Sequence, residues 1–249
     1  MPGCLHRYVL PAVLCVALTF GSGAAEELSV DPGQWPFTAI GKLNVVTGPG
    51  SRQFCSATLV GQRHVLTAAH CLYDKFRTKW VDPSSVHFVA AYTQGGYKAH
   101  AKGKNYRKSE RFEFRAGTNP ANLAHDWAVI ELDRDVTIKP VRVSSLTAAD
   151  LGAVTTSEIM RAGYRADRDQ VMSAQHNCSA RLVLEPAALL LHDCRSIFGE
   201  SGAALMRVTE GEPEIIGVLV ASSQREGAVP SIAVPVTTFS SVLTALLKP

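Results

Sequence analysis

The chain has 249 residues, of which 46% are hydrophobic and 19% are charged, so it can bury one large core or two smaller ones. Its composition is that of an ordinary globular protein. The formal net charge of +3 at pH 7 is small, and it gives no reason to expect nucleic acid or an anionic membrane surface as a partner.

The first 25 residues have the layout of a secretory signal peptide. His6 and Arg7 precede an apolar run over Tyr8–Phe20, and small residues follow up to position 25. The apolar run is too short to span a bilayer comfortably, and no other segment is apolar enough to do so. We therefore expect that residues 1–25 are removed, that the mature chain is secreted or periplasmic, and that it keeps no stable membrane anchor.

Removal of the signal peptide leaves four of the six cysteines, and an even number in an exported chain suggests two disulfides. Three pairings are possible, and sequence order favours Cys55–Cys71 and Cys178–Cys194. Each bond would close a loop of about 15 residues, which stabilises a fold by about 3 kcal/mol in the chain-entropy model. A zinc site is the alternative, but no close Cys-x-x-Cys or histidine pair supports it.

The mature part contains many short, apolar, β-branched runs separated by turn residues. This spacing predicts an all-β barrel or sandwich rather than alternating strands and helices. Helical periodicity begins only near residue 237, and a break in the strand pattern falls near residues 139–153. We expect one β unit at 26–143, a second at 144–236 and a C-terminal helix at 237–249. The predicted strands are Phe37–Val46, Ala57–Val60, His64–Thr67, Val86–Ala91, Trp127–Leu132, Glu158–Gly163, Ala180–Leu184, Ala203–Val208, Ile215–Val220 and Ser231–Val234.

The segment Lys98–Arg115 is dense in positive charge and has aromatic residues interleaved. It is either a binding patch for an anionic partner or a solvated surface loop. Glu110 and Glu113 dilute the charge, so the loop is the favoured interpretation.

A histidine, an aspartate and a serine stand in three short motifs. His70 ends the run Leu-Thr-Ala-Ala-His and is followed at once by Cys71, whose disulfide would fix the backbone of the histidine. Asp126 directly precedes a predicted strand in His-Asp-Trp-Ala-Val-Ile-Glu-Leu, and Ser201 lies in Gly-Glu-Ser-Gly. Each residue alone has an ordinary explanation, as a packed or surface imidazole, a turn aspartate or a loop serine.

Together, and in this order on a disulfide-bearing β framework, the three motifs resemble those of the trypsin/chymotrypsin-like serine proteases. The resemblance spans nearly the whole mature chain. The His-Asp-Cys ahead of the serine motif is most similar to the secreted bacterial trypsin-like and glutamyl endopeptidase branch.

This resemblance implies two antiparallel β-barrels packed side by side, with the active site in the cleft between them. It implies a catalytic triad of His70, Asp126 and Ser201, and an oxyanion hole formed by the backbone N–H groups of Gly199 and Ser201. It implies peptide or protein substrates and a monomeric chain, with no metal or other cofactor and no nucleic acid. The resulting prediction is a secreted serine endopeptidase, and the alternative is a catalytically silent protein of the same fold that binds a partner.

The chain departs from the digestive enzymes at Glu200, where they have an aspartate that pairs with a newly cut amino terminus. No basic residue followed by an Ile-Val type pair occurs near the expected mature start. We therefore expect that Glu200 pairs with a nearby arginine or faces solvent, and that removal of the signal peptide alone gives the active form. Ala203 and Ala204 replace a small residue and a proline, which we expect to affect packing only.

The specificity pocket is less readable. Arg195 stands where trypsin-like enzymes carry the carboxylate at the base of the pocket, and Val220 and Ser222 belong to the predicted pocket wall. An inward arginine would repel Lys and Arg and favour acidic side chains, whereas an arginine bent outward would do neither. Leu219 stands where glutamyl endopeptidases show a histidine, and Val220 replaces a usual serine, so a preference for Glu is not favoured.

Overall fold

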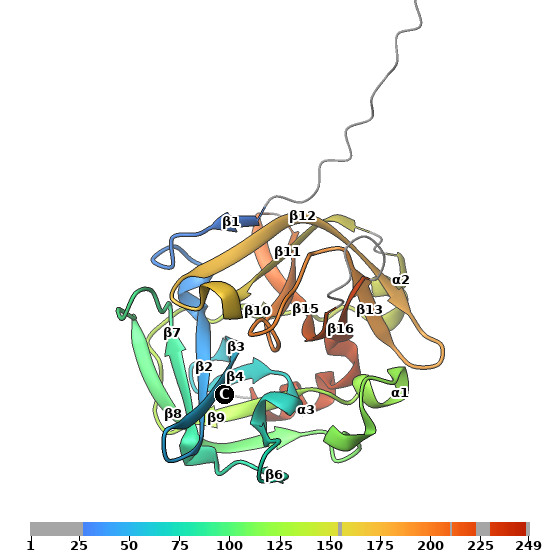
Figure 1. The fold of residues 1–249 in the computed structure, drawn as a ribbon. Coiled ribbons are helices and arrows are strands. Elements are labelled where there is room, and N and C mark those ends of the chain that lie inside the picture. Colours follow the sequence, from blue (N-terminus) through green and yellow to red (C-terminus); the bar gives the residue numbers. More distant parts are fainter. Residues whose placement is uncertain (1–26, 154–155, 210, 223–229, 248–249) are drawn as a thin grey trace, which may run out of the picture.

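The structure is a computed structural model that describes residues 27–153, 156–209, 211–222 and 230–247, so the predicted signal peptide lies outside the described residues. Within them, two six-stranded antiparallel β-barrels lie side by side, the first below and the second above in Figure 1. The prediction of an all-β fold with two barrels is therefore confirmed. No helix in the described ranges is long and apolar enough to cross a membrane.

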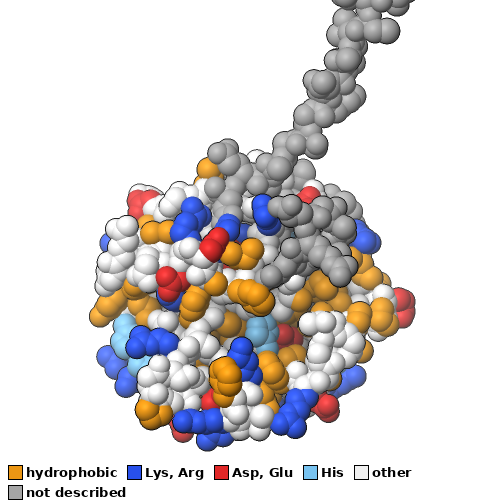
Figure 2. All heavy atoms as spheres, viewed as in Figure 1, with side chains coloured by type: hydrophobic (Ala, Val, Ile, Leu, Met, Phe, Trp, Pro, Cys, Tyr) orange, Lys and Arg blue, Asp and Glu red, His pale blue; other side chains and the backbone are white. Residues whose placement is uncertain are grey.

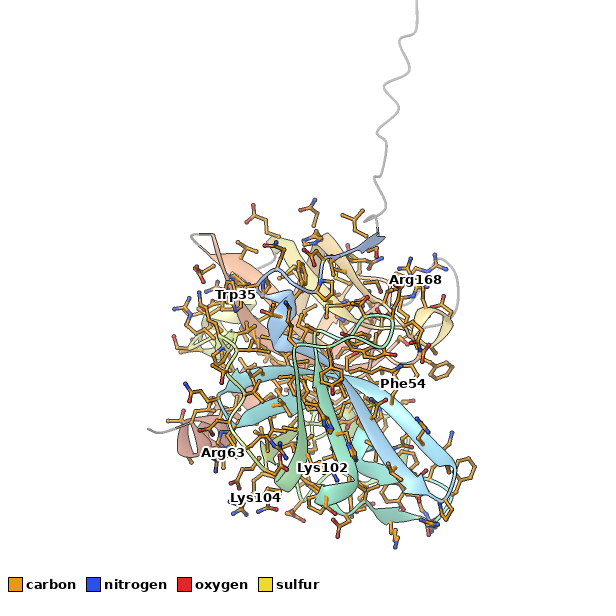
Figure 3. The ribbon with its side chains drawn as sticks, turned by 90° about the vertical axis from the view of Figure 1, so that its left-hand side faces the viewer. Trp35, Phe54, Arg63, Lys102, Lys104 and Arg168 are labelled. Atoms are coloured by element: carbon orange, nitrogen blue, oxygen red, sulfur yellow. A yellow bond between two sulfur atoms is a disulfide. The ribbon has the colours of Figure 1, made fainter. Side chains whose placement is uncertain are left out.

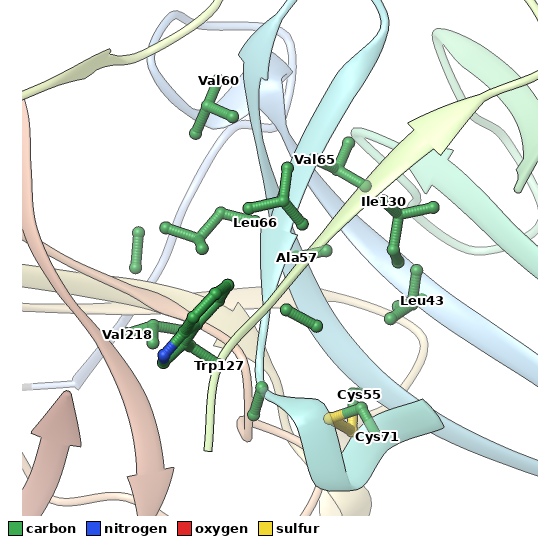
Figure 4. Close-up of a cluster of buried hydrophobic side chains, with 14 of the residues drawn as sticks. Leu43, Cys55, Ala57, Val60, Val65, Leu66, Cys71, Trp127, Ile130 and Val218 are labelled. Carbon is green, nitrogen blue, oxygen red and sulfur yellow. A yellow bond between two sulfur atoms is a disulfide. The ribbon is translucent and has the colours of Figure 1, made fainter. Parts of the chain in front are cut away.

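The first barrel closes in the order β2-β3-β4-β9-β8-β7. Its interior is filled by alternating inward side chains of the strands, among them the fully buried Leu43, Val65 and Ile130 (Figure 4). A two-stranded ribbon of β5 and β6 lies outside it. The bounds are β2 Ile40–Gly48, β3 Ser51–Gly61, β4 His64–Thr67, β5 Tyr73–Asp74, β6 Lys79–Trp80, β7 Val86–Ala90, β8 Ala99–Lys108 and β9 Ala128–Leu132.

The second barrel runs in the order β12-β11-β14-β15-β16-β13, and pairing of β13 with β12 closes the ring. It has a separate small core that includes Ile159, Leu205 and Ile216, with Leu151 packed into it. Strand β1 extends the sheet beside β12, and β10 pairs in parallel with β15. The bounds are β1 Glu27–Ser29, β10 Arg142–Val143, β11 Thr156–Tyr164, β12 Met172–Val183, β13 Leu189–His192, β14 Ala204–Thr209, β15 Glu212–Ala221 and β16 Ser231–Pro235.

The α-helices are short, and the first two lie in connections between strands. The C-terminal helix crosses back to the first barrel, where Phe239 stacks on Trp127 with ring centroids 4.9 Å apart. The α-helices are α1 Pro120–Leu123, α2 Ala148–Ala153 and α3 Ser240–Leu246, and the 3-10 turns are η1 Phe37–Ala39, η2 Ala69–Leu72, η3 Pro83–Ser85, η4 Phe114–Ala116, η5 Ala166–Arg168 and η6 Val236–Thr238.

The interpretation of Lys98–Arg115 as a surface loop is wrong for most of its length, because Ala99–Lys108 forms strand β8 of the first barrel. The inward residues in the first half of this strand are small: Ala101 is fully buried, and a side chain on Gly103 would meet the carbonyl oxygen of Pro83 at 2.5 Å. Because these inward residues are small, the segment shows no alternation of large apolar and polar side chains. The outward lysines therefore made it resemble a solvated loop. Phe112 is buried as well.

Candidate active site

His70 is held in η2, directly after strand β4. The disulfide Cys55–Cys71, with an S–S distance of 2.05 Å, ties the next residue to strand β3. The carboxamide of Gln53, also on β3, donates to the carbonyl oxygen of Cys71 at 3.0 Å. The backbone that carries the imidazole is therefore fixed from β3 by one covalent bond and one hydrogen bond, as a ring that must be placed accurately requires.

Asp126 lies behind His70 and is 2% exposed. It follows α1, whose first turn is capped by the side chain of Asn119, which accepts from the Asn122 N–H at 2.9 Å. Both oxygens of the Asp126 carboxylate bind His70: Oδ1 accepts from the backbone N–H at 2.8 Å, and Oδ2 lies 2.6 Å from the ring Nδ1. This pair of bonds fixes the ring orientation and leaves Nε2 directed elsewhere.

The pKa of His70 results from two opposed effects. Removal of the ring from water lowers the pKa, whereas the negative charge of Asp126 and its hydrogen bond raise it. The net result is a pKa above the usual 6.5. The carboxylate thus makes the imidazole a stronger base than it would be at this site without a charged partner.

Ser201 lies on a tight turn that only glycine permits at two positions. Gly199 has φ +92° and Gly202 has φ +82°, values in the left-handed region that side chains disfavour. A Cβ on Gly202 would approach the carbonyl oxygen of Ser56 to 2.3 Å, and one on Gly199 would approach that of Tyr164 to 2.7 Å. The two glycines therefore allow the serine turn to pass directly against neighbouring backbone.

Ser56 on β3 joins this turn to the first barrel. Its N–H donates to the carbonyl oxygen of Ser201 at 2.8 Å, and its hydroxyl donates to that of Gly199 at 3.1 Å. The same hydroxyl accepts from the Tyr164 N–H at 2.8 Å. One residue of the first barrel thus contacts the two ends of the serine turn and strand β11 of the second.

The amides of Gly199 and Ser201 have no hydrogen-bond acceptor within the described part of the chain. Ser201 lines the same cavity as His70, although no hydrogen bond joins the two side chains in the described structure. Such contacts are often long before substrate binds and tighten during the reaction. The structure therefore brings the three candidate residues to one cavity, with the His70–Asp126 contact fully formed.

Glu200 is fully buried and forms an ion pair with Arg161 of β11, which is also fully buried. The second carboxylate oxygen of Glu200 accepts from the Ile197 N–H at 2.9 Å, and Arg161 Nη2 donates to the carbonyl oxygen of Arg195 at 2.8 Å. The pair thus connects three points of the loop that leads to Ser201. Of the two fates expected for Glu200, the structure has the pairing with an arginine.

The cavity has a volume of about 720 Å³ and lies between the two barrels. In Figure 2, which looks onto this face, a histidine lies near the centre between hydrophobic side chains. Val220 and Ser222 line the cavity as predicted for a pocket wall, whereas Arg195 is exposed and is not among the lining residues. The lining residues that sequence reasoning did not identify are largely aromatic and basic: Arg52, Phe54, Tyr73, Lys75, Phe112, Phe114 and Phe198.

The aromatic wall left only a weak signal in the sequence. Phe112 and Phe114 are two of the aromatic residues interleaved in the basic segment Lys98–Arg115, but nothing in that pattern places them beside the cavity. Ring centroids of Phe114 and Tyr73 lie 4.4 Å apart in a stacked arrangement, so the wall brings together residues 41 positions apart. Such a contact depends on the fold and not on local spacing.

Cys55, His70 and Cys71 have ligand atoms within 4.8 Å of one another. The two sulfurs are bonded to each other, so neither is a thiolate that could hold a metal ion. The second disulfide, Cys178–Cys194, joins β12 to the residues just after β13 and has an S–S distance of 2.03 Å. Both bonds are between the cysteines that sequence order favoured.

The double barrel with a half-buried histidine bound to a buried aspartate, beside a serine turn, defines a chymotrypsin-like fold. The family model described as Trypsin matches residues 27–243, and the chain belongs to the trypsin family. Neutrophil elastase of Mus musculus is 27% identical over 171 residues, which cover 65% of this chain and 57% of that protein. The match thus spans little more than half the length of that relative.

Two solved structures share the fold. A Glu endopeptidase is similar with a TM-score of 0.66 and 17% identity, covering 91% of this chain and 99% of the other. Protease Anisep from Arthrobacter nicotinovorans has a TM-score of 0.65 and 17% identity, covering 89% and 99%. At this identity the likeness concerns the fold.

Proposed function

We propose that the chain is a secreted serine endopeptidase that cleaves peptide or protein substrates, with Ser201 as nucleophile, His70 as general base and Asp126 as the residue that orients His70. The observation that carries the proposal is the double contact between His70 and the buried Asp126, made at the cavity that Ser201 also lines. A histidine–carboxylate pair of this kind is the arrangement that activates a serine hydroxyl.

In this mechanism Ser201 Oγ attacks the carbonyl carbon of the scissile bond while its proton moves to His70 Nε2. The amides of Gly199 and Ser201 hold the developing oxyanion, and one such donor contributes about 3–4 kcal/mol. The C–N bond then breaks as His70 returns the proton to the leaving amine. A water molecule, deprotonated by His70, attacks the acyl-enzyme and releases the carboxylic acid and the free serine.

The described wall of the pocket is uncharged, with Val220, Ala221 and Ser222 in sequence. We expect it to accept an uncharged side chain before the cut, in line with the exposed position of Arg195. Peptides that vary this residue test the point: efficient cleavage after Lys, Arg or Glu contradicts it.

The buried Arg161–Glu200 pair supports the proposal that no further cut is needed for activation. The carboxylate before the nucleophile already has a cationic partner inside the fold, so it has no need of a new amino terminus. We expect residues 1–25 to be removed on export and the resulting chain to be active. If the secreted chain with an amino terminus near residue 26 stays inert until a second cut is made, the proposal is wrong.

A fluorophosphonate probe tests the nucleophile directly, because it reacts only with an activated serine. The mature chain should take up one probe per molecule, and Ser201→Ala should take up none. Ser222→Ala is a matched control, since it removes another hydroxyl of the same cavity without removing the proposed nucleophile. A folded wild-type chain that never labels would favour the alternative of a silent binding protein.

A further inference from the structure

One end of the cavity carries two cationic side chains that form no ion pair within the described residues. Arg52 lies on β3, three residues before Cys55, and Lys75 follows β5; both are exposed and both line the cavity. Among the lining residues that the structure describes, the only acidic side chain is Asp126, which is buried and bound to His70. The charge that the described lining offers to a bound molecule is therefore positive, and it is confined to one end.

The two cations stand on a frame that hydrogen bonds hold in place. Gln53, next to Arg52, donates to the carbonyl oxygens of Cys71 at 3.0 Å and Tyr73 at 3.1 Å, so β3 is tied to the segment that leads to Lys75. The buried carboxylate of Asp74 accepts from the N–H groups of Phe76 at 2.9 Å and of Arg77 at 3.0 Å.

The guanidinium of Arg77 in turn binds the carbonyl oxygen of Thr47 on β2. These contacts close the loop that presents Lys75 and fasten it to the first barrel. Arg52 and Lys75 are therefore presented from fixed backbone at the cavity rim, and a ligand that binds them does not have to order the loop first.

The end of the cavity that carries Arg52 and Lys75 can be assigned to one part of the substrate from its position relative to Ser201. This assignment rests on the proposed function. If the acyl part of the substrate lies along Val220–Ser222 of the second barrel, the leaving amine extends the other way, past His70 and the Cys55–Cys71 disulfide. Arg52 and Lys75 belong to the two segments that this disulfide joins, three residues before Cys55 and four residues after Cys71.

We propose that this end binds the residues that follow the scissile bond and selects substrates with aspartate or glutamate there. An exposed ion pair is worth up to about fivefold in affinity. Two cations acting together should therefore favour Asp over Lys among these residues by about five- to tenfold. The preference should shrink in 1 M salt, because exposed charges are screened within about 3 Å at that ionic strength.

Peptides with one fixed sequence before the cut and either Asp or Lys at the three positions after it test the proposal. The kcat/KM for each peptide is divided by the rate of the same variant on a methyl ester of the fixed part, which has no residue after the cut. Losses of folding or of chemistry then cancel. We expect an Asp:Lys ratio of about five to ten in the wild type, near one in Arg52→Ala/Lys75→Ala, and below one in Arg52→Glu/Lys75→Glu.

Lys104→Ala is the matched control, because Lys104 pairs with Glu131 and lies far from Phe54 of the cavity wall in Figure 3. Its Asp:Lys ratio should equal that of the wild type. A wild-type ratio near one, with fluorophosphonate labelling intact, overturns the acidic preference and leaves the proposed function standing. A chain that neither labels nor cleaves the ester overturns both.

Discussion

Replacing Glu200 by glutamine tests how the serine loop is held in place. The substitution keeps the size of the side chain and removes only its charge, so the guanidinium of Arg161 stays fully buried without its anionic partner. Apart from residue 200, its hydrogen-bond acceptor is the carbonyl oxygen of Arg195 at 2.8 Å, and its Nε has no acceptor within the described chain. Removing one member of a buried ion pair costs about 3–5 kcal/mol, because the other charge is left uncompensated.

We therefore expect Glu200→Gln to lower the free energy of unfolding by about 3–5 kcal/mol. In a domain of this size the melting temperature should fall by about 6 to 20 °C. Urea unfolding followed by tryptophan fluorescence, with both disulfides intact, measures the loss as a lower midpoint at an unchanged slope. The matched control is Glu110→Gln, whose carboxylate is 89% exposed and should change stability by less than about 0.5 kcal/mol.

A double variant separates the effect of the buried charges from the effect of the volume that the two side chains fill. Arg161→Met together with Glu200→Met removes both buried charges and keeps an apolar filling, so it should be more stable than Glu200→Gln alone. If Glu200→Gln unfolds at the same urea concentration as the parent, or if the double variant is no better than the single one, the assigned role of the pair is refuted.

Three further outcomes follow from the site. The kcat/KM should rise with pH through a midpoint above 6.5, because neutral His70 is the base and its pKa is raised. In Asp126→Asn the negative charge that raises this pKa is gone, so the midpoint should move below 6.5 and kcat should fall about 10⁴-fold. Burial and then the charge of Arg161 lower the pKa of His192 to about 3, so only the unfolded chain takes up this proton as pH falls from 6.5. Urea unfolding should therefore show about 2–3 kcal/mol less stability at pH 4.5 than at pH 6.5 from this group, a loss that His192→Gln removes. Ser56→Ala leaves the Tyr164 N–H and a carbonyl oxygen unpaired, and it should cost about 1–3 kcal/mol in urea and slow fluorophosphonate labelling; unchanged labelling would contradict the tethering role.

Strands with a clear apolar pattern could be predicted from the sequence, and His64–Thr67 coincides with β4 residue for residue. Strand β8 could not, because in its first half the inward positions are alanine and glycine and the outward positions are basic. Strand β13, with three leucines in succession, shows no alternation either. Periodicity identifies a strand only when the buried side chains are apolar and the exposed ones are not.

The candidate site also has residues that could be predicted from the sequence and residues that could not. His70, Asp126 and Ser201 stand in motifs that local sequence displays, and the cavity contains all three. The arginine that pairs with Glu200 could be expected only as some arginine nearby, because nothing around Arg161 distinguishes it from other arginines in strands. Partners of this kind are set by which strands become neighbours in the closed barrel, and that information is not local.

The adjacent residues Cys55 and Ser56 of β3 are therefore of special interest, because the first holds the segment of His70 within the first barrel and the second connects that barrel to the Ser201 turn. Through its disulfide, Cys55 fixes the backbone next to His70, and through three hydrogen bonds Ser56 fixes both ends of the Ser201 turn and strand β11. Adjacent residues of one strand point to opposite faces, so a single rigid segment reaches the histidine on one side and the nucleophile on the other. The spacing between base and nucleophile is then set by one stretch of β3 rather than by the looser contact between two domains. Catalysis requires the base and the nucleophile to be placed to well within 1 Å of their working positions. A short, rigid segment that holds both residues provides this accuracy.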